Sequence, residues 1–93
     1  MAIATFERTV YSDRTPFDAS AQGISQLSAA ATRGQAVFDG QGRCNTCHSG
    51  ALFSDNQFHN IGLRPQSQDS GRFAVTNNPA DLGAFRTASL RNV

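Results

Sequence analysis

One stretch of the chain repeats small and apolar residues at the spacing of an α-helix. The residues that share this helical face are Leu27, Ala30, Ala31, Gly34, Val37 and Phe38. Ser28 has a side chain suited to cap the first turn, and Gly40 is suited to end the helix. We therefore predict a helix between Ser28 and Gly40, which is the clearest element in the sequence.

The residues before this helix have weaker patterns. Residues 2–10 predict a short helix, residues 12–16 a turn, and the small, polar residues 18–26 a loop. Met1, the only methionine, is interpreted as the initiator. The sequence thus predicts an N-terminal helix and linker over residues 1–26, leading into a domain over residues 27–93.

The residues after Cys47 are rich in turn formers. They leave room for short helices at 71–76 and 79–82, and nothing after Arg86 is long enough for a closing helix. The predicted fold is mainly α, with short helices, long irregular loops and no C-terminal helix to complete it.

The strongest chemical signal is the pentapeptide Cys44-Asn45-Thr46-Cys47-His48, which has the C-x-x-C-H pattern of c-type haem attachment. Two thiols at this spacing can form thioether bonds to the two vinyl groups of one haem. His48 then follows directly and can bind the iron through its imidazole. The motif uses both cysteines of the chain.

Other chemistries of this pentapeptide fit less well. A thioredoxin-like dithiol expects a strand before it and a βαβ context, which the sequence lacks. A structural zinc site needs four ligands, and the candidates are Cys44, Cys47, His48 and His59. A disulfide across so short a loop would stabilise little. Haem c is the preferred interpretation, with a zinc or dithiol module as the alternative.

Composition supports a domain that needs a cofactor as part of its core. The chain has 93 residues, of which 39% are apolar, with eight glycines and three prolines. Domains of this size usually need a disulfide, metal or cofactor for stability, and a covalent porphyrin is a large apolar plate. The net charge of +1, with arginine as the only basic residue type, indicates no nucleic-acid partner.

The chain has no apolar run of the roughly 18–20 residues that a membrane span requires. Residues 2–8 do not predict a signal peptide, because this stretch is short and becomes polar at once. Haem c is normally attached outside the cytoplasm. We therefore expect a mature product or a piece of a longer protein.

A series of short blocks resembles the bacterial di-haem cytochrome c peroxidase family, which includes the MauG-like enzymes. The blocks are residues 5–9 with 16–18, 34–48, 53–55 with 58–62, 69–72, 81–87 and 90–93. Within them, Gly34-Gln35-Ala36-Val37-Phe38 resembles the cytochrome c helix whose glycine lets another helix cross closely. In this order the blocks resemble the first part of the family's C-terminal haem domain, so residues 27–93 would be a partial cytochrome c-like domain.

The resemblance implies a function and a set of partners. Cys44 and Cys47 would carry one haem c and His48 would be its proximal ligand. In such enzymes this haem accepts electrons from a small donor protein and passes them to an N-terminal haem domain that reduces hydrogen peroxide. MauG-like members instead oxidise a partner protein. The resemblance also implies a periplasmic location and a calcium ion between the domains of the complete protein.

This chain departs from the family pattern in two ways. Ala88 stands where the family usually has proline, which removes a fixed φ angle. The stretch that supplies the family's distal ligand, methionine or tyrosine, lies beyond Val93, and the chain's only tyrosine, Tyr11, is near the other end.

His59 is the remaining histidine and a candidate distal iron ligand. The alternative interpretation is a packed or hydrogen-bonded histidine beside an open or water-bound iron position, or a ligand from a second chain. Arg72, Arg86 and Arg91 are candidates for binding the haem propionates, because arginine pairs well with carboxylates. Surface solvation is the alternative for each of them.

Two functions therefore compete within the haem interpretation. The first is the electron-accepting haem domain of a di-haem peroxidase, which works with an N-terminal haem domain or a complementary chain. The second is a stand-alone monohaem cytochrome c that carries electrons. The family implies a peroxidase-type oxidoreductase, whereas this chain alone is expected only to transfer electrons.

Overall fold

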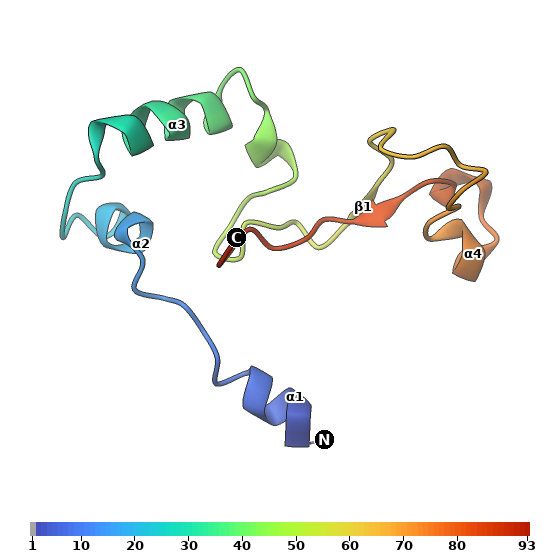
Figure 1. Ribbon diagram of the computed structural model, residues 1–93, viewed down its shortest axis with the longest axis horizontal. Coiled ribbons are helices and arrows are strands. Elements are labelled where there is room, and N and C mark those ends of the chain that lie inside the picture. The colour runs from blue at the N-terminus through green and yellow to red at the C-terminus, as the bar shows by residue number, and fades with distance from the viewer. Residues whose placement is uncertain (1) are drawn as a thin grey trace. The chain divides into compact units, whose positions relative to one another are not determined.

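The computed structural model describes residues 2–93, so that Met1, interpreted as the initiator, lies outside the described residues. The chain divides into two compact units. Figure 1 labels the main helices and a strand along the chain. The first unit contains the residues up to Arg43 together with Asn92, and the second contains residues 44–91 with Val93. The domain boundary that the sequence predicts between residues 26 and 27 stays a prediction.

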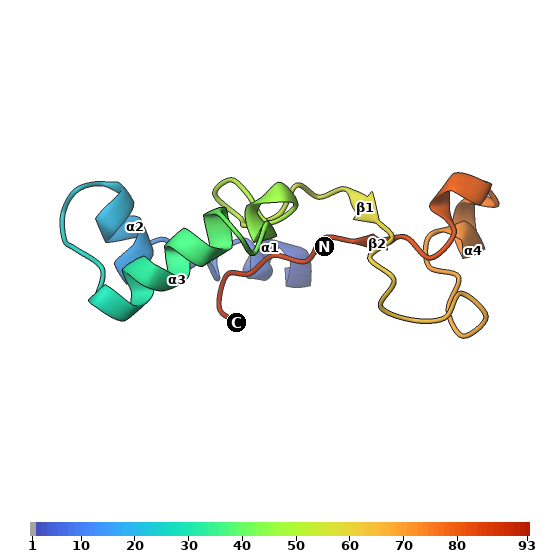
Figure 2. The ribbon, with the colours of Figure 1, turned by 90° about the horizontal axis from the view of Figure 1, so that it is seen from above.

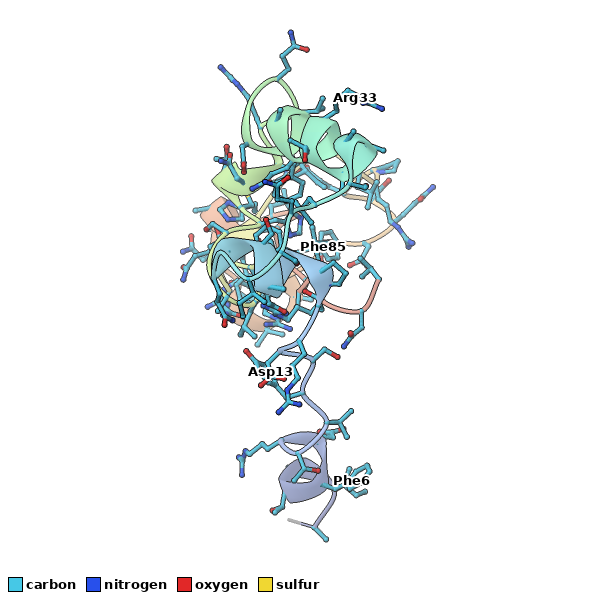
Figure 3. The ribbon with its side chains drawn as sticks, turned by 90° about the vertical axis from the view of Figure 1, so that its left-hand side faces the viewer. Phe6, Asp13, Arg33 and Phe85 are labelled. Carbon is cyan, nitrogen blue, oxygen red and sulfur yellow. The ribbon has the colours of Figure 1, made fainter. Side chains whose placement is uncertain are left out.

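The first unit contains three helices, α1 (Ala2–Glu7), α2 (Pro16–Ala21) and α3 (Ala29–Asp39). Helix α1 ends three residues earlier than predicted, and a turn follows in which the Thr9 hydroxyl donates to the Phe6 carbonyl at 2.6 Å. The Phe6 ring extends from this helix and is 67% exposed (Figure 3).

Helix α2 occupies the first part of the segment predicted as a loop, so that prediction is wrong for residues 18–21. The cause is a capping box. The Thr15 hydroxyl accepts the Asp18 N–H at 3.2 Å, while the Thr15 N–H donates to the Asp18 carboxylate at 3.0 Å. Pro16, at the first helical position, loses no hydrogen bond there.

Helix α3 confirms the clearest sequence prediction. The Ser28 hydroxyl accepts the Ala31 N–H at 3.2 Å, and Gly40 is the residue at which the helix ends. A Cβ placed on Gly34 would meet no atom within 4 Å. The close helix crossing predicted at this glycine is therefore not found among residues 2–93.

The second unit is built from short elements. It contains the 3₁₀ helix η1 (Cys44–Thr46), helix α4 (Phe73–Thr76) and the 3₁₀ helix η2 (Pro79–Asp81). The helices predicted near 71–76 and 79–82 are confirmed as α4 and η2. Asn77 ends α4 in the left-handed conformation that asparagine tolerates, with φ +53°.

A two-stranded antiparallel sheet completes this unit, and the sequence did not predict it. Strand β1 (Phe58–His59) pairs with β2 (Phe85–Arg86), with Phe58 opposite Arg86 and His59 opposite Phe85 (Figure 2). Strands of two residues are too short to show the alternating pattern that reveals a strand in sequence.

The protein core is very small, as the composition predicted. Within residues 2–93, Ala84 is the one buried apolar side chain and Thr87 the one buried polar side chain. Large apolar side chains such as Ile61 and Leu63 remain 75% exposed. The observed fold is thus a set of short helices and irregular loops with a little sheet. No helix of the described residues could span a membrane.

Candidate haem site

The pentapeptide 44–48 begins the second unit as a single tight turn. The carbonyl of Cys44 accepts the N–H of Cys47 at 3.3 Å and the N–H of His48 at 2.9 Å. Neither cysteine is in a disulfide and both are half-buried, so the disulfide alternative is not realised. A turn with two accessible thiols and a histidine directly after the second is the arrangement that double thioether attachment needs.

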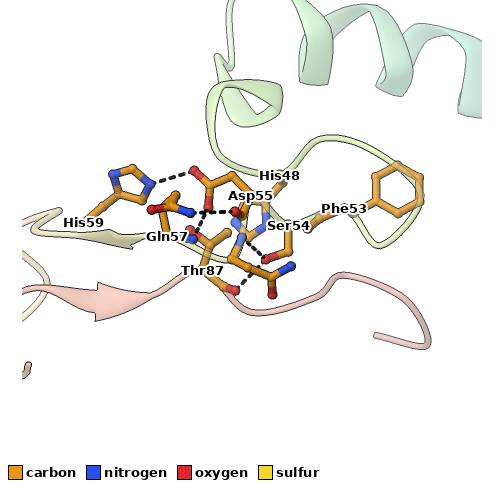
Figure 4. Close-up of polar contacts among 8 residues, drawn as sticks. His48, Phe53, Ser54, Asp55, Gln57, His59 and Thr87 are labelled. Atoms are coloured by element: carbon orange, nitrogen blue, oxygen red, sulfur yellow. Dashed lines mark hydrogen bonds and ion pairs between the residues drawn. The ribbon is translucent and has the colours of Figure 1, made fainter. Parts of the chain in front are cut away.

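His48 is oriented by a backbone carbonyl five residues later. Its Nδ1 lies 3.0 Å from the carbonyl oxygen of Phe53 (Figure 4). A carbonyl can only accept, so the proton belongs on Nδ1 and the lone pair on Nε2. Metal-binding histidines are held in this way, with one ring nitrogen donating to a carbonyl and the other binding the metal.

The loop that carries this carbonyl is closed by its own backbone. The N–H of Phe53 donates to Gly50 at 3.0 Å, that of Ser54 to Ser49 at 2.9 Å, and that of Asp55 to Cys47 at 2.8 Å. Phe53 itself has φ +50°, in the left-handed region that residues with a Cβ rarely adopt. The loop therefore returns the chain to the haem motif immediately after leaving it.

An open pocket of about 260 Å³ lies beside the motif. Its lining consists of Cys47, His48, His59, Ile61, Leu63, Phe85, Arg86, Thr87 and Ala88. His59 and Phe85 lie opposite each other in the β1–β2 pair, and both line the pocket together with Arg86.

His59 lies on the same pocket as His48, but one ring nitrogen already has a partner. Its Nε2 is 2.7 Å from a carboxylate oxygen of Asp55 (Figure 4). The Gln57 N–H contributes most to lowering the pKa of Asp55 to about 2, and hydrogen bonds from His59 and Thr87 lower it further, against a smaller opposing effect of burial. Asp55 is thus ionised. It accepts hydrogen bonds from Gln57 and His59, which follow it in the chain, and from Thr87, which follows strand β2.

The three candidate arginines have different surroundings. The guanidinium of Arg72 lies 4.1 Å from the centre of the Phe58 ring, and its Nε lies 3.4 Å from an Asp81 carboxylate oxygen. Arg86 donates to the side-chain oxygen of Asn56 at 2.8 Å. Arg86 alone of the three lines the pocket.

The third candidate, Arg91, donates through Nε to the Ala51 carbonyl at 2.5 Å. Its guanidinium lies 5.5 Å from the centre of the Phe53 ring. Binding of propionates by these arginines stays a prediction.

The structure also gives a ligand set for the zinc alternative that differs from the predicted one. Ligand atoms of Cys47, Asp55 and His59 lie within 4.8 Å of one another, whereas the prediction had Cys44 and His48 in place of Asp55. The sequence signal for Asp55 is its position four residues before His59, which is too common to identify a site. Three ligands leave this set one short of a structural zinc site.

The residues present fit a covalently bound haem. A flat apolar group with an iron centre requires two thiols outside any disulfide, a histidine with Nε2 available and an open apolar pocket, here lined by Ile61, Leu63 and Phe85. Ile61 and Leu63, each 75% exposed, give this pocket an apolar rim. The fold and site thus fit a c-type haem module.

Comparisons with known proteins identify the family. No model of a protein family matches the chain. The chain is 44% identical to methylamine utilization protein MauG of Methylorubrum extorquens, over 99% of the chain and 27% of that protein. It is 38% identical to a cytochrome-c peroxidase of Denitromonas iodatirespirans, over 99% of the chain and 33% of that protein. With cytochrome c551 peroxidase of Pseudomonas aeruginosa the identity is 36%, over 100% of the chain and 29% of that protein.

A solved structure agrees with these relatives. The crystal structure of a MauG-like protein associated with microbial copper homeostasis matches 98% of this chain and 31% of its own, with a TM-score of 0.86 and 34% identity. The chain therefore belongs to the bacterial di-haem cytochrome c peroxidase and MauG-like family. It spans about a third of the length of these relatives. At the level of the family, a haem-based redox role follows.

Proposed function

We propose that this chain binds one haem c through thioether bonds to Cys44 and Cys47, with His48 Nε2 as the proximal iron ligand, and that it transfers electrons. The observation that carries the proposal is the 3.0 Å hydrogen bond from His48 Nδ1 to the Phe53 carbonyl. A histidine that only faces solvent does not need a hydrogen bond to fix its ring. As an iron ligand it needs its tautomer and ring plane fixed, and this bond does both.

Each part of the site then has a task. The cysteines hold the porphyrin at one edge, while Ile61, Leu63 and Phe85 exclude water from its face. When bound, the haem supplies an iron centre that accepts and releases one electron at a time. Exclusion of water and a fixed axial ligand both reduce rearrangement around that centre, which favours rapid electron transfer.

We further propose that the chain is the first part of the C-terminal haem domain of a di-haem enzyme. Its partner would be an N-terminal haem domain, and a small protein in the periplasm would donate electrons for the reduction of hydrogen peroxide. Its similarity to MauG supports the alternative of a MauG-like oxidoreductase. The complete protein would bind calcium between its domains, as the family resemblance implies.

For His59 we propose a supporting role rather than iron ligation. Asp55 accepts a hydrogen bond from its Nε2, which leaves only Nδ1 for a metal. The Asp55–His59 pair would instead hold strand β1 against the motif, because the Asp55 N–H donates to the Cys47 carbonyl.

The test of haem attachment is direct. We expect the protein, produced in a host with a cytochrome c maturation system, to show a pyridine haemochrome spectrum and a mass larger than the polypeptide by one haem. Cys44→Ala should leave one thioether bond and alter the spectrum, and Cys44→Ala with Cys47→Ala should abolish covalent haem. The mass of the bare polypeptide would contradict the proposal, and that mass plus one zinc ion would support the zinc alternative.

A further inference from the structure

Residues 87–91, a short segment that ends in a turn at Arg91, contact the loop behind His48 at three points. The Thr87 carbonyl accepts from the Ser54 hydroxyl at 2.7 Å. The Ser89 hydroxyl donates to the Leu52 carbonyl at 2.7 Å. Arg91 Nε donates to the Ala51 carbonyl at 2.5 Å. We call residues 87–91 the clamp segment and residues 51–54 the proximal loop.

These three contacts follow a regular pattern. Thr87 takes part through its backbone carbonyl, whereas Ser89 and Arg91 take part through their side chains. The proximal loop is contacted in the reverse order, from Ser54 back to Ala51. The two segments are more than thirty positions apart in sequence, with separations of 33, 37 and 40 residues for the three bonds. Such contacts order the loop without forming a regular sheet.

The peptide unit between Phe53 and Ser54 lies at the centre of this arrangement. Its carbonyl accepts from His48 Nδ1, and its N–H donates to the Ser49 carbonyl at 2.9 Å. The peptide plane is therefore held at both edges. The clamp segment fixes the residues on either side of it, through Leu52 and Ser54.

The conformation of Phe53 explains why such support is needed. A phenylalanine at φ +50° is unfavourable and persists only when its surroundings impose it. Arg91 adds to that constraint, because its guanidinium lies over the Phe53 ring while its Nε holds the carbonyl of Ala51. Loss of these contacts would let the loop relax and turn the Phe53 carbonyl away from His48.

We propose that Ser89 and Arg91 are positioning residues that tune the haem, an inference that rests on the proposed function. They hold the Phe53 carbonyl against the His48 Nδ1–H. A donated Nδ1–H makes the imidazole a stronger electron donor to the iron, which favours the ferric state and lowers the reduction potential. Neither residue lines the pocket, so neither has to touch the haem for this effect.

The experiment compares variants of the haem-loaded protein by spectroelectrochemical titration. We expect Ser89→Ala and Arg91→Gln each to raise the midpoint potential. Substitution of a residue that supports a metal-binding histidine typically changes metal affinity or activity by roughly tenfold or more. A tenfold shift of the one-electron equilibrium corresponds to about 59 mV. Ser89→Thr keeps a hydroxyl and should restore the original value.

A second measurement examines the hydrogen bond itself. Exchange of the His48 Nδ1–H with solvent, followed by proton NMR of the reduced protein, should be faster in Ser89→Ala and Arg91→Gln than in the unsubstituted protein. Ser67→Ala and Arg64→Gln are matched controls, because both positions are exposed and lie in the same unit. Both controls should leave the potential and the exchange rate unchanged.

The outcomes separate this inference from the proposed function. Ser89 is exposed, so its alanine variant is expected to fold and to bind haem. Unchanged potential and exchange in both Ser89→Ala and Arg91→Gln, with haem bound, would overturn the tuning role and leave the proposed function intact. Absence of covalent haem from the unsubstituted protein would overturn both.

Discussion

His48 Nδ1 lies 3.0 Å from the carbonyl oxygen of Phe53, a residue whose φ of +50° places that carbonyl in an unusual direction. The hydrogen bond links the haem motif to the loop that follows it, and the clamp segment links that loop to the far end of the unit. The proximal histidine is thus held by residues that are spread over the second unit rather than by the motif alone.

Substitution of His48 should remove the proximal ligand but not the attachment. In His48→Ala we expect both thioether bonds to form, because they depend on Cys44 and Cys47, while the Soret band and the reduction potential both change. Mass spectrometry checks attachment, and absorbance with potentiometry checks coordination. A variant with unchanged Soret band and potential would show that His48 does not bind the iron.

Substitution of His59 serves as the comparison. Because Asp55 occupies its Nε2, we expect His59→Ala to leave the spin state of the haem nearly unchanged and to lower stability only slightly. Electron paramagnetic resonance and the charge-transfer absorbance report the spin state. A change from six-coordinate to five-coordinate iron in this variant would instead identify His59 as the distal ligand.

Asp55 should make the second unit sensitive to strong acid. Its pKa is lowered from 3.8 to about 2, so its contribution to stability is fully present above pH 3.8 and is lost as the pH falls through about 2. We expect Asp55→Asn to be less stable than the unsubstituted protein at neutral pH. Thermal unfolding should show this difference shrinking as the pH approaches 2, and a difference that does not change with pH would contradict the role of the carboxylate.

The backbone conformation of Phe53 gives a prediction with an internal control. Phe53→Val should destabilise the protein by about 1–3 kcal/mol, because a β-branched residue is strongly disfavoured at positive φ. Phe53→Gly and Phe53→Asn suit this φ and should keep the carbonyl in place, although both lose the contact with Arg91. Denaturant unfolding measures the stability of all three. Equal stabilities for the valine and glycine variants would show that the left-handed conformation carries no strain.

Sequence reasoning reached the elements whose signals are local. Helix α3 has its caps at Ser28 and Gly40 as predicted, because capping depends on residues within one turn. The haem motif is equally local. The capping box of Thr15 and Asp18 was also local and was missed, since aspartate takes the place usually held by glutamate or glutamine in that motif.

The parts that could not be predicted depend on contacts between distant residues. The pairing of His59 with Phe85 and the bond from Ser89 to Leu52 join segments with no shared periodicity. The φ of Phe53 is set by those contacts and not by the preference of phenylalanine. The attachment residues could therefore be named from the sequence, whereas the residues that orient His48 could not.

Two glycines should respond to alanine in opposite ways. Gly71 has φ +60°, and a Cβ there would collide with the Ala84 carbonyl oxygen, next to the one buried apolar side chain of the described residues. The same carbonyl accepts the Arg72 N–H at 2.8 Å, so it cannot move away from an added Cβ without disturbing that hydrogen bond. Gly71→Ala should therefore destabilise the protein by more than about 1 kcal/mol.

Gly34 lies inside α3 with open space around it, so Gly34→Ala should stabilise the helix by about 0.5–1 kcal/mol. Thermal unfolding of both variants checks the pair. Gly34→Ala could instead destabilise the complete protein while it stabilises residues 1–93 alone. That result would show that a helix from elsewhere in the protein crosses α3 at this glycine.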